Sequence, residues 1–204
     1  MDARVQAVVD ELAARIEKER EIIADKTREF STDDMALAAG PHSAGLLNLL
    51  IRTKNAQRVV EVGTSIGYTA LFLGEAARAT GGRVVGIEYL DKKHGQAIDH
   101  LRRAGLADIV DVRKGDAKEI LATLDGPIDV AFIDAWKSDY IAYFDMLLPK
   151  MSVGGCIVAD NITFPESVRE TMQQYQDHVR SRPNVRSSFL SVGSGLEMSV
   201  KIAA

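Results

Sequence analysis

The segment VVEVGTSIGYT (residues 59–69) passes from a short apolar run, through a turn with two glycines, into a helical pattern. A buried strand followed by a tight turn and a helix is the repeating unit of parallel α/β sheets. Gly63 and Gly67 allow the backbone to pass close to a ligand at the start of the helix. The glycine spacing differs from the dinucleotide fingerprint, and no Gly-Lys-Ser/Thr phosphate loop is present.

Apolar runs and helical patterns continue to alternate on the carboxyl side of this segment. We expect strands at residues 58–62, 83–88, 109–113, 128–134 and 155–160. We expect helices between them at residues 68–79, 91–104, 117–124 and 139–150. Such alternation predicts a doubly wound, Rossmann-like α/β fold, with a mostly parallel sheet that helices cover on both faces.

The two ends of the chain depart from this alternation. Residues 1–52 contain two amphipathic helical patterns, at 2–24 and from Pro41, for which we expect a lid or a dimer surface. After a helix at 165–181, two strand patterns at 187–192 and 196–203 are joined by Gly193-Ser194-Gly195, which is typical of a hairpin. We therefore expect seven strands with an antiparallel C-terminal strand, in a single domain over residues 1–204 with a cofactor-binding core at 58–204.

Composition excludes several classes of protein. The chain has 204 residues, 46% of them hydrophobic, and a net charge of −4, without the basic stripe that nucleic-acid binding requires. No apolar run approaches the roughly 20 residues of a membrane-spanning helix. Cys156 is the single cysteine, so no internal disulfide can form. We expect a cytoplasmic protein that binds neither nucleic acid nor membrane.

Two short runs, FIDAWK (132–137) and VADN (158–161), each close a predicted buried strand. Asp134, Asp160 and Asn161 would therefore meet where parallel strands end. Carboxylate and amide oxygens suit Mg²⁺ or a similar hard cation. Lys137 lies one turn past the first donor, close enough to act on a molecule bound there. The alternatives are a helix-capping acid, an Asx turn and a solvated surface lysine.

Acidic residues also follow the first strands. Glu61, next to a helix amino terminus, suits a ligand end with a positive charge better than a pyrophosphate. Glu88 ends the second strand, where an acid commonly receives the two ribose hydroxyls of an adenosine cofactor. Asp116, after the third strand, adds a contact to the adenine edge. The alternative is a glycine-rich turn with solvated acids, but the order of these residues favours an adenosine ligand with a cationic tail.

These residues resemble the class I S-adenosylmethionine-dependent methyltransferases, and more narrowly the metal-dependent O-methyltransferases of the catechol and caffeoyl-coenzyme A type. The resemblance spans residues 38–201, and FIDAWKSDY (132–140) and CIVADN (156–161) are its most specific parts. It implies that Asp134, Asp160 and Asn161 bind Mg²⁺ or another divalent cation such as Mn²⁺ or Ca²⁺. It implies that Lys137 takes the hydroxyl proton of the substrate.

The resemblance also implies contacts to cofactor and substrate. The positions implied for S-adenosylmethionine are Glu61, Gly63, Ser65, Tyr68, Thr69, Glu88, Tyr89, Asp116, Ala117, Asp134 and Trp136. Trp136 would pack against adenine, with an ordinary core position as the alternative. The positions implied for substrate are Lys137, Asn161 and Glu197. The chain departs from the family pattern at residues 38–45, at Ala135 and at Ser194, which stands where an aspartate is common, so the pocket wall is the least defined part.

The expected function is methyl transfer from S-adenosylmethionine to a small aromatic diol by a homodimeric, metal-dependent enzyme. The same chemistry on a caffeoyl-coenzyme A-like or natural-product phenol is the first alternative. An S-adenosylmethionine-binding protein without turnover and a nicotinamide dehydrogenase are further alternatives. The glycine spacing speaks against the dehydrogenase.

Overall fold

The computed structural model describes residues 1–24, 31 and 33–204. The strands are β1 (Arg58–Val62), β2 (Arg83–Glu88), β3 (Val110–Lys114), β4 (Ile128–Ile133), β5 (Met151–Ala159), β6 (Val185–Leu190) and β7 (Leu196–Lys201). The α-helices are α1 (Ala3–Ala24), α2 (Pro41–Lys54), α3 (Tyr68–Thr80), α4 (Asp91–Ala104), α5 (Ala117–Thr123), α6 (Tyr140–Leu147) and α7 (Arg169–Arg180). Short 3-10 helices span Lys137–Asp139, Leu148–Lys150 and Glu166–Val168.

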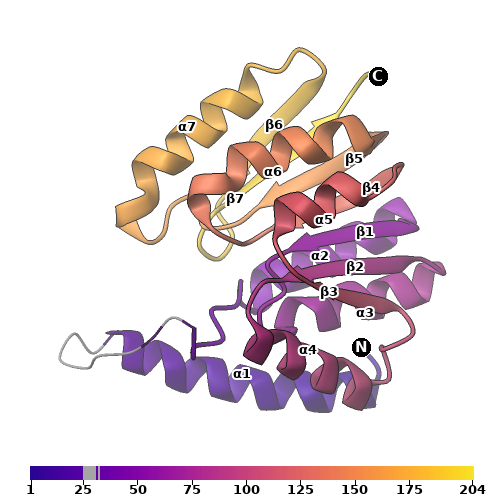
Figure 1. Cartoon of the computed structure of the whole chain (residues 1–204), viewed down its shortest axis with the longest axis vertical. Helices are drawn as coiled ribbons and strands as arrows, with labels where there is room; N and C mark the ends of the chain where they lie inside the picture. Colours follow the sequence, from indigo (N-terminus) through magenta and orange to yellow (C-terminus); the bar gives the residue numbers. More distant parts are fainter. Residues whose placement is uncertain (25–30, 32) are drawn as a thin grey trace.

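Among the described residues, seven strands form one sheet in the order β3-β2-β1-β4-β5-β7-β6 (Figure 1). The pairs among β1 to β5 are parallel, and β7 runs antiparallel to both β5 and β6. This confirms the predicted seven-stranded, mostly parallel sheet with an antiparallel C-terminal strand.

The fifth strand differs most from its predicted range, because it begins at Met151 rather than at residue 155. Its pairing with β4 shifts register between Ile128 and Val130, which marks an irregularity in the ladder. Gly154 lies in this stretch with a φ of 82°, a conformation that a residue with a side chain rarely adopts. Gly154 and Gly155, at the start of the predicted strand, therefore lie inside a longer and irregular one.

Side chains on the central strands alternate between two apolar layers, as the pleat of a strand requires. Val59 and Phe132 pack with residues of α1, α2, α3 and α4. Val60 and Ala131, their neighbours in sequence, pack with residues of α5, α6 and α7 on the other face. In Figure 1, α5 and α6 lie in front of the sheet and α2 lies behind it. The sheet is thus covered on both faces.

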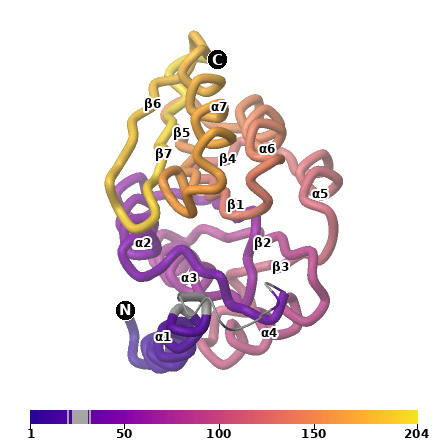
Figure 2. Tube along the Cα trace, turned by 90° about the vertical axis from the view of Figure 1, so that its left-hand side faces the viewer, coloured from indigo at the N-terminus to yellow at the C-terminus, as the bar shows by residue number. Residues whose placement is uncertain are grey.

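The apolar face of α1 is buried inside the molecule. Val5, Val8 and Leu12 belong to the core that also contains residues of α3 and α4. Figure 2 shows α1 below α3 and beside α4, at the lower end of the molecule. The apolar stripe of this helix is therefore used for internal packing, so it does not support the expected dimer surface, and the homodimer stays a prediction.

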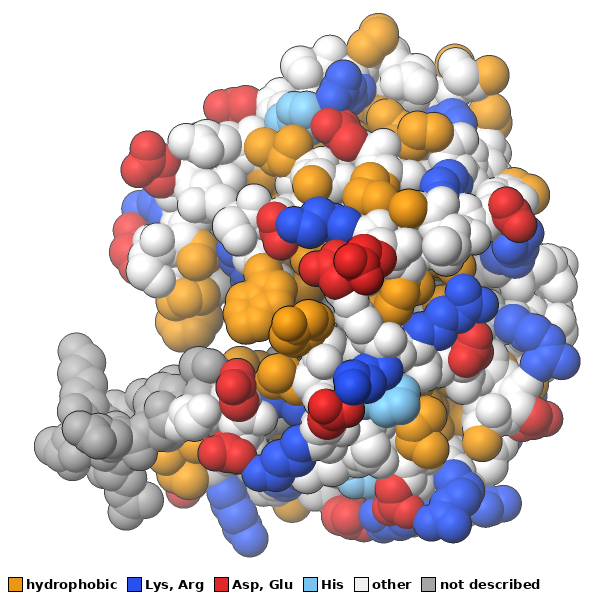
Figure 3. Space-filling view, viewed as in Figure 1, with side chains coloured by type: hydrophobic (Ala, Val, Ile, Leu, Met, Phe, Trp, Pro, Cys, Tyr) orange, Lys and Arg blue, Asp and Glu red, His pale blue; other side chains and the backbone are white. Residues whose placement is uncertain are grey.

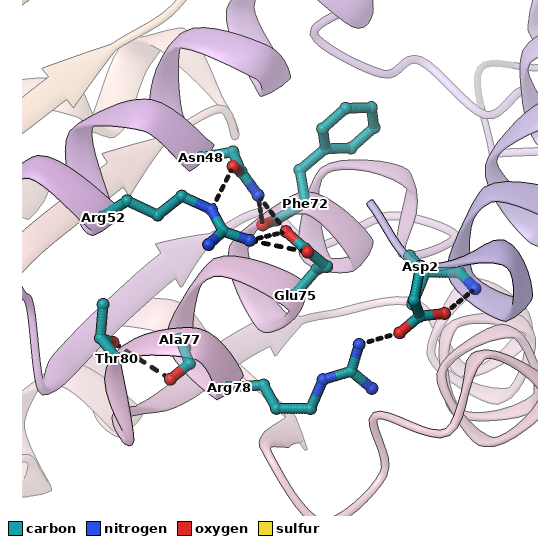
Figure 4. A network of polar contacts seen from close by, with 9 residues as sticks. Asp2, Asn48, Arg52, Phe72, Glu75, Ala77, Arg78 and Thr80 are labelled. Atoms are coloured by element: carbon teal, nitrogen blue, oxygen red, sulfur yellow. Dashed lines mark hydrogen bonds and ion pairs between the residues drawn. The ribbon is translucent and has the colours of Figure 1, made fainter.

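A polar network joins α2 to α3 (Figure 4). The buried Glu75 accepts hydrogen bonds from Asn48 Nδ2 at 2.8 Å and from Arg52 Nη2 at 2.7 Å. Asp2, just before α1, forms an ion pair with Arg78 at the end of α3. These contacts hold the N-terminal helices against the core that carries the β1 loop.

On the face drawn in Figure 3, acidic and basic side chains are interspersed. In the part of the chain that the structure describes, no helix is both long and apolar enough to span a membrane.

Candidate active site

The loops after β1, β2 and β4 surround a pocket of about 650 Å³. The strand order reverses between β1 and β4, and open α/β sheets bind ligands outside the carboxyl ends of strands at such a point. Most positions predicted for the cofactor line this pocket: Gly63, Ser65, Glu88, Tyr89, Asp116, Ala117, Asp134 and Trp136. Lys137 lines it as well. Its size is within the range of small-molecule sites.

The glycine turn after β1 is tightly fitted. Gly63 has a φ of 94°, and a Cβ at this position would collide with the backbone carbonyl of Asp134. Gly67 has a φ of 90°, and its Cβ would lie 3.2 Å from the Cα of Ala97 in α4. The turn is also anchored to β2, because the amides of Gly63 and Thr64 donate to Ile87 O at 3.0 and 2.9 Å. Glycine is therefore required at both positions.

Glu61 is fully buried just before this turn. Neither of its carboxylate oxygens has a hydrogen-bond partner among the described residues. Burial raises the pKa of Glu61 to about 8, and the charges of Asp134 and Glu88 add to the rise. Glu61 does not itself line the pocket. A buried acid without a partner at this place fits a ligand that carries a positive charge.

Tyr68 and Thr69, also predicted for the cofactor, lie buried at the start of α3 and do not line the pocket.

The carboxylate of Glu88 accepts hydrogen bonds from the amide of Ser65 at 2.7 Å and of Leu90 at 2.8 Å. These bonds fix it at the end of β2, facing the pocket. Asp116 Oδ1 caps α5 by accepting from the amide of Lys118 at 2.7 Å.

The two predicted metal-binding acids follow neighbouring strands. Ile133 and Ala159 are partners in the β4–β5 ladder, so Asp134 and Asp160 are the next residues on adjacent strands. The amide of Asp160 donates to Ile133 O at 3.0 Å. Asn161 comes next, with a φ of 61°. The pocket lining includes Asp134 but not Asp160 or Asn161.

Asp160 is fully buried, and its two oxygens have different surroundings. Oδ1 accepts a hydrogen bond from the Ser194 hydroxyl at 2.7 Å. Oδ2 is buried and has no partner within the described part of the chain. Burial, together with the charge of Asp134, raises the pKa of Asp160 to about 7. Two carboxylates, one with an orphaned oxygen, fit a cation between them.

The donor types decide which ions fit. The described residues contain no group of three or more His, Cys, Asp or Glu side chains arranged for a metal. The set here is two carboxylates and one amide, which suits Mg²⁺, Mn²⁺ or Ca²⁺ rather than a metal that prefers thiolate or imidazole.

Lys137 begins the 3-10 helix that follows β4. Its Nζ donates to Asp134 Oδ1 at 3.1 Å and to Ala135 O at 3.0 Å. It also lies 5.3 Å from the ring centroid of Tyr140. The side chain is 21% exposed, so it reaches the pocket without being freely solvated. This arrangement excludes the alternative of a solvated surface lysine.

Apolar side chains form the mouth of the pocket. Trp136 is 56% exposed and Tyr89 is 60% exposed, although both line the pocket. The alternative of Trp136 as a core residue is therefore wrong. Leu37, 47% exposed, completes the mouth from the segment before α2.

Sequence reasoning missed Leu37, and it missed Lys93 of α4 in the pocket wall. Leu37 has a φ of 44°, which is uncommon for a residue with a side chain. The sequence around Leu37 has neither helical nor strand periodicity, so its place in the pocket wall could not be predicted. Lys93 is buried, and burial lowers its pKa. Lys93 stands among charged residues in the sequence of α4, so a solvent-exposed position was expected and its burial could not be predicted.

Glu197, predicted to contact the substrate, lies outside the lining of this pocket. It is fully buried, and its carboxylate accepts hydrogen bonds from Gln176 Nε2 at 2.6 Å and Arg180 Nη2 at 3.0 Å, both on α7. It pairs with Ala159 in the ladder, on the sheet face that α7 covers, and it does not line the pocket. The structure therefore does not support the predicted contact between Glu197 and substrate. Its side chain instead fixes α7 to the C-terminal hairpin.

Known proteins resemble this chain over most of its length. A family model described as O-methyltransferase matches residues 12–202. The catechol O-methyltransferase of Niastella koreensis is 36% identical over 131 residues, which cover 62% of this chain and 59% of that protein. The catechol O-methyltransferase of Mycobacterium tuberculosis is 39% identical over 127 residues, 62% of this chain and 57% of that protein. The match thus spans less than two thirds of the length of these two relatives.

A plant relative and solved structures extend the likeness. Caffeoyl-CoA O-methyltransferase 1 of Eucalyptus globulus is 28% identical over 177 residues, 77% of this chain and 72% of that protein. The crystal structure of the O-methyltransferase TomG from Streptomyces achromogenes, in complex with SAM, superposes with a TM-score of 0.80 at 26% identity, covering 100% of this chain and 91% of that chain. An O-methyltransferase from Bacillus cereus in complex with SAH gives 0.77 at 26% identity, covering 98% and 91%.

Proposed function

Because this chain belongs to the O-methyltransferase family, we propose that it transfers a methyl group from S-adenosylmethionine to one hydroxyl of a small aromatic diol, with the help of a divalent cation. The observation that carries the proposal is the meeting of two strand ends. Asp134 and Asp160 follow adjacent strands beside the pocket, and Lys137 Nζ lies 3.1 Å from Asp134 Oδ1. The names of the two bacterial relatives support the diol as substrate class.

The β1 turn and the end of β2 would hold the cofactor. The fixed carboxylate of Glu88 suits the ribose hydroxyls, and the exposed face of Trp136 suits adenine. Glu61, protonated in the free protein, would release its proton when the cationic end of the cofactor binds, and the carboxylate would then favour that charge. When bound, S-adenosylmethionine supplies an electrophilic methyl group, which the substrate oxygen receives as the methyl–sulfur bond breaks.

Asp134, Asp160 and Asn161 would hold the cation, and the orphaned Oδ2 of Asp160 is the donor that most needs one. When bound, such an ion supplies charge stabilisation for the two vicinal oxygens of a diol. Asp134 and Asp160 directly follow two adjacent strands, and Asn161 is the next residue after Asp160. The pairing of β4 with β5 therefore fixes the separation of the two acids. That rigidity favours alignment of the substrate, which contributes several kcal/mol to such reactions.

Lys137 would remove the proton from the reacting hydroxyl. A phenol has a pKa of about 10 and is a poor nucleophile while protonated. Lys137 would first release a proton to solvent and then accept the hydroxyl proton, and the ammonium formed would donate to Asp134 Oδ1 and Ala135 O as it does in the structure. Proton transfer by a positioned group typically contributes about 10²- to 10⁴-fold to the rate.

A caffeoyl-coenzyme A-like phenol is the second candidate substrate. The plant relative matches 77% of this chain, compared with 62% for the bacterial catechol enzymes. Both candidates share the diol that the proposed cation site requires, so they differ only in what extends out of the pocket.

A methyl-transfer assay tests the proposal. The purified protein with S-adenosylmethionine and Mg²⁺ should methylate catechol, caffeic acid or caffeoyl-coenzyme A, and EDTA should abolish turnover until Mg²⁺ is restored in excess. Tight binding of S-adenosylmethionine without methylation of any diol would instead favour a binding protein without turnover. Methylation that is unaffected by EDTA would contradict the role of the cation.

A further inference from the structure

The turn between β6 and β7 reaches the proposed cation donors. Ser194, at the centre of Gly193–Gly195, donates its hydroxyl hydrogen to Asp160 Oδ1 at 2.7 Å. Asp160 is fully buried and Ser194 is half-buried, so this bond is partly shielded from water. One carboxylate oxygen is thereby engaged, and the other, Oδ2, is left without a partner in the described structure.

The same turn also holds the loop that carries Asn161. The carbonyl of Ser194 accepts hydrogen bonds from Thr163 N at 3.0 Å and Thr163 Oγ1 at 2.8 Å. The carbonyl of Gly195 accepts from Ile162 N at 3.1 Å. Asn161 has a φ of 61°, an uncommon conformation that the surrounding contacts must maintain. The turn therefore contacts Asp160 through the Ser194 side chain and, through its backbone, the two residues that follow Asn161.

The position of Ser194 is itself closely fixed. Gly193 has a φ of 57°, and a Cβ there would lie 2.7 Å from Ser43 Oγ at the start of α2. Gly195 has a φ of 85°, and its Cβ would lie 2.8 Å from Thr163 Oγ1. The turn is thus packed between α2 and the Asn161 loop, and Ser194 has little freedom to move.

We propose that Ser194 is a positioning residue for the cation, which it does not touch. Its hydroxyl holds Asp160 Oδ1, so that the rotation of the carboxylate is fixed and Oδ2 is directed to the ion. This inference rests on the proposed function, because it presupposes the cation site. Groups that hydrogen-bond to metal ligands typically change metal affinity about 10- to 100-fold when they are removed.

Mn²⁺ binding to the full chain tests this role, followed by electron paramagnetic resonance of the free ion. Ser194→Ala should weaken Mn²⁺ binding about 10- to 100-fold. Ser194→Thr, which keeps the hydroxyl, should bind Mn²⁺ within a few-fold of the wild type. Ser191→Ala is the matched control, since Ser191 is an exposed serine just before the same turn, and it should bind Mn²⁺ as the wild type does.

The affinity for S-adenosylhomocysteine, measured by calorimetry, distinguishes positioning from general damage. Ser194→Ala should bind it with the affinity of the wild type, because Ser194 does not line the cofactor pocket. Unchanged Mn²⁺ affinity in Ser194→Ala would overturn the positioning role while leaving the proposed function intact. Equal losses of Mn²⁺ and S-adenosylhomocysteine affinity would also overturn it. A wild-type protein that binds no Mn²⁺ would overturn the cation site and this role together.

Discussion

Glu61 is an acid whose burial has consequences for stability. Its pKa is about 8 in the folded protein, against an ordinary value of 4.5. Between these values the folded protein keeps a proton that the unfolded chain releases. The free energy of unfolding without cofactor should therefore fall as the pH rises from 5 to 8, by an amount on the order of a few kcal/mol.

Glu61→Gln removes this titration, so the variant should lose less stability than the wild type between pH 5 and pH 8. Urea unfolding at both pH values measures the difference, with the exposed Glu119→Gln as matched control. The same variant should bind S-adenosylmethionine more weakly, because an amide cannot become a carboxylate when the cationic end of the cofactor binds. If the free energy of unfolding fell equally in the wild type and in Glu61→Gln between pH 5 and pH 8, the assigned pKa of Glu61 would be wrong.

Lys137 has a chemical role that can be separated from binding. Lys137→Ala should lower kcat about 10²- to 10⁴-fold, since the hydroxyl proton loses its acceptor. Calorimetric affinity for S-adenosylhomocysteine should stay near that of the wild type. Lys18→Ala, at an exposed position of α1, is the control for loss of a positive charge. Normal turnover in Lys137→Ala would remove this residue from the mechanism.

Among the elements, β1 and β4 can end side by side only because residue 63, directly after β1, is a glycine. Gly63→Ala would place a Cβ against the carbonyl of Asp134, at a φ of 94°. We expect this variant to misfold or to lose cofactor binding. Gly95→Ala is the matched control, because nothing lies within 4 Å of a Cβ at this position in α4. It should raise the free energy of unfolding by about 0.5–1 kcal/mol, as measured in urea.

The contact between β7 and α7 gives Glu197 a structural role. Glu197→Ala leaves Gln176 and Arg180 without their acceptor, and should lower the free energy of unfolding by about 1–3 kcal/mol. Urea unfolding and the KM for a diol should be measured together. A raised KM without loss of stability would restore the substrate contact predicted from sequence.

The elements themselves were predictable because each leaves a local pattern. Strands buried on both faces are short apolar runs, and Pro41 marks the start of α2. The face that Glu197 occupies was not predictable in this way. It depends on the register of β7 against β5, and a slip of one residue would turn the side chain to the opposite face.

Part of the site was also predictable from the sequence, namely the residues that lie close after a strand. The donors and Lys137 directly follow strands, so a correct topology brings them to one edge of the sheet. Leu37 and Lys93 line the pocket only because the segment before α2 and the helix α4 fold over it. No local pattern encodes that contact.

At the scale of the molecule, the pocket is a product of the sheet order. The chain builds β1, β2 and β3 outward to one side and then returns to place β4 on the other side of β1. The connections leave the sheet in opposite directions at this point, and the loops after β1 and β4 line the same pocket. The proposed cofactor and cation sites meet there.

The central claim is that Asp134, Asp160 and Asn161 hold one divalent cation beside the cofactor pocket. Crystals grown with S-adenosylhomocysteine and saturating Mn²⁺ allow a direct test by anomalous scattering at the manganese edge. We predict one strong peak within coordination distance of oxygens from all three side chains. A map without a peak between them would contradict the claim.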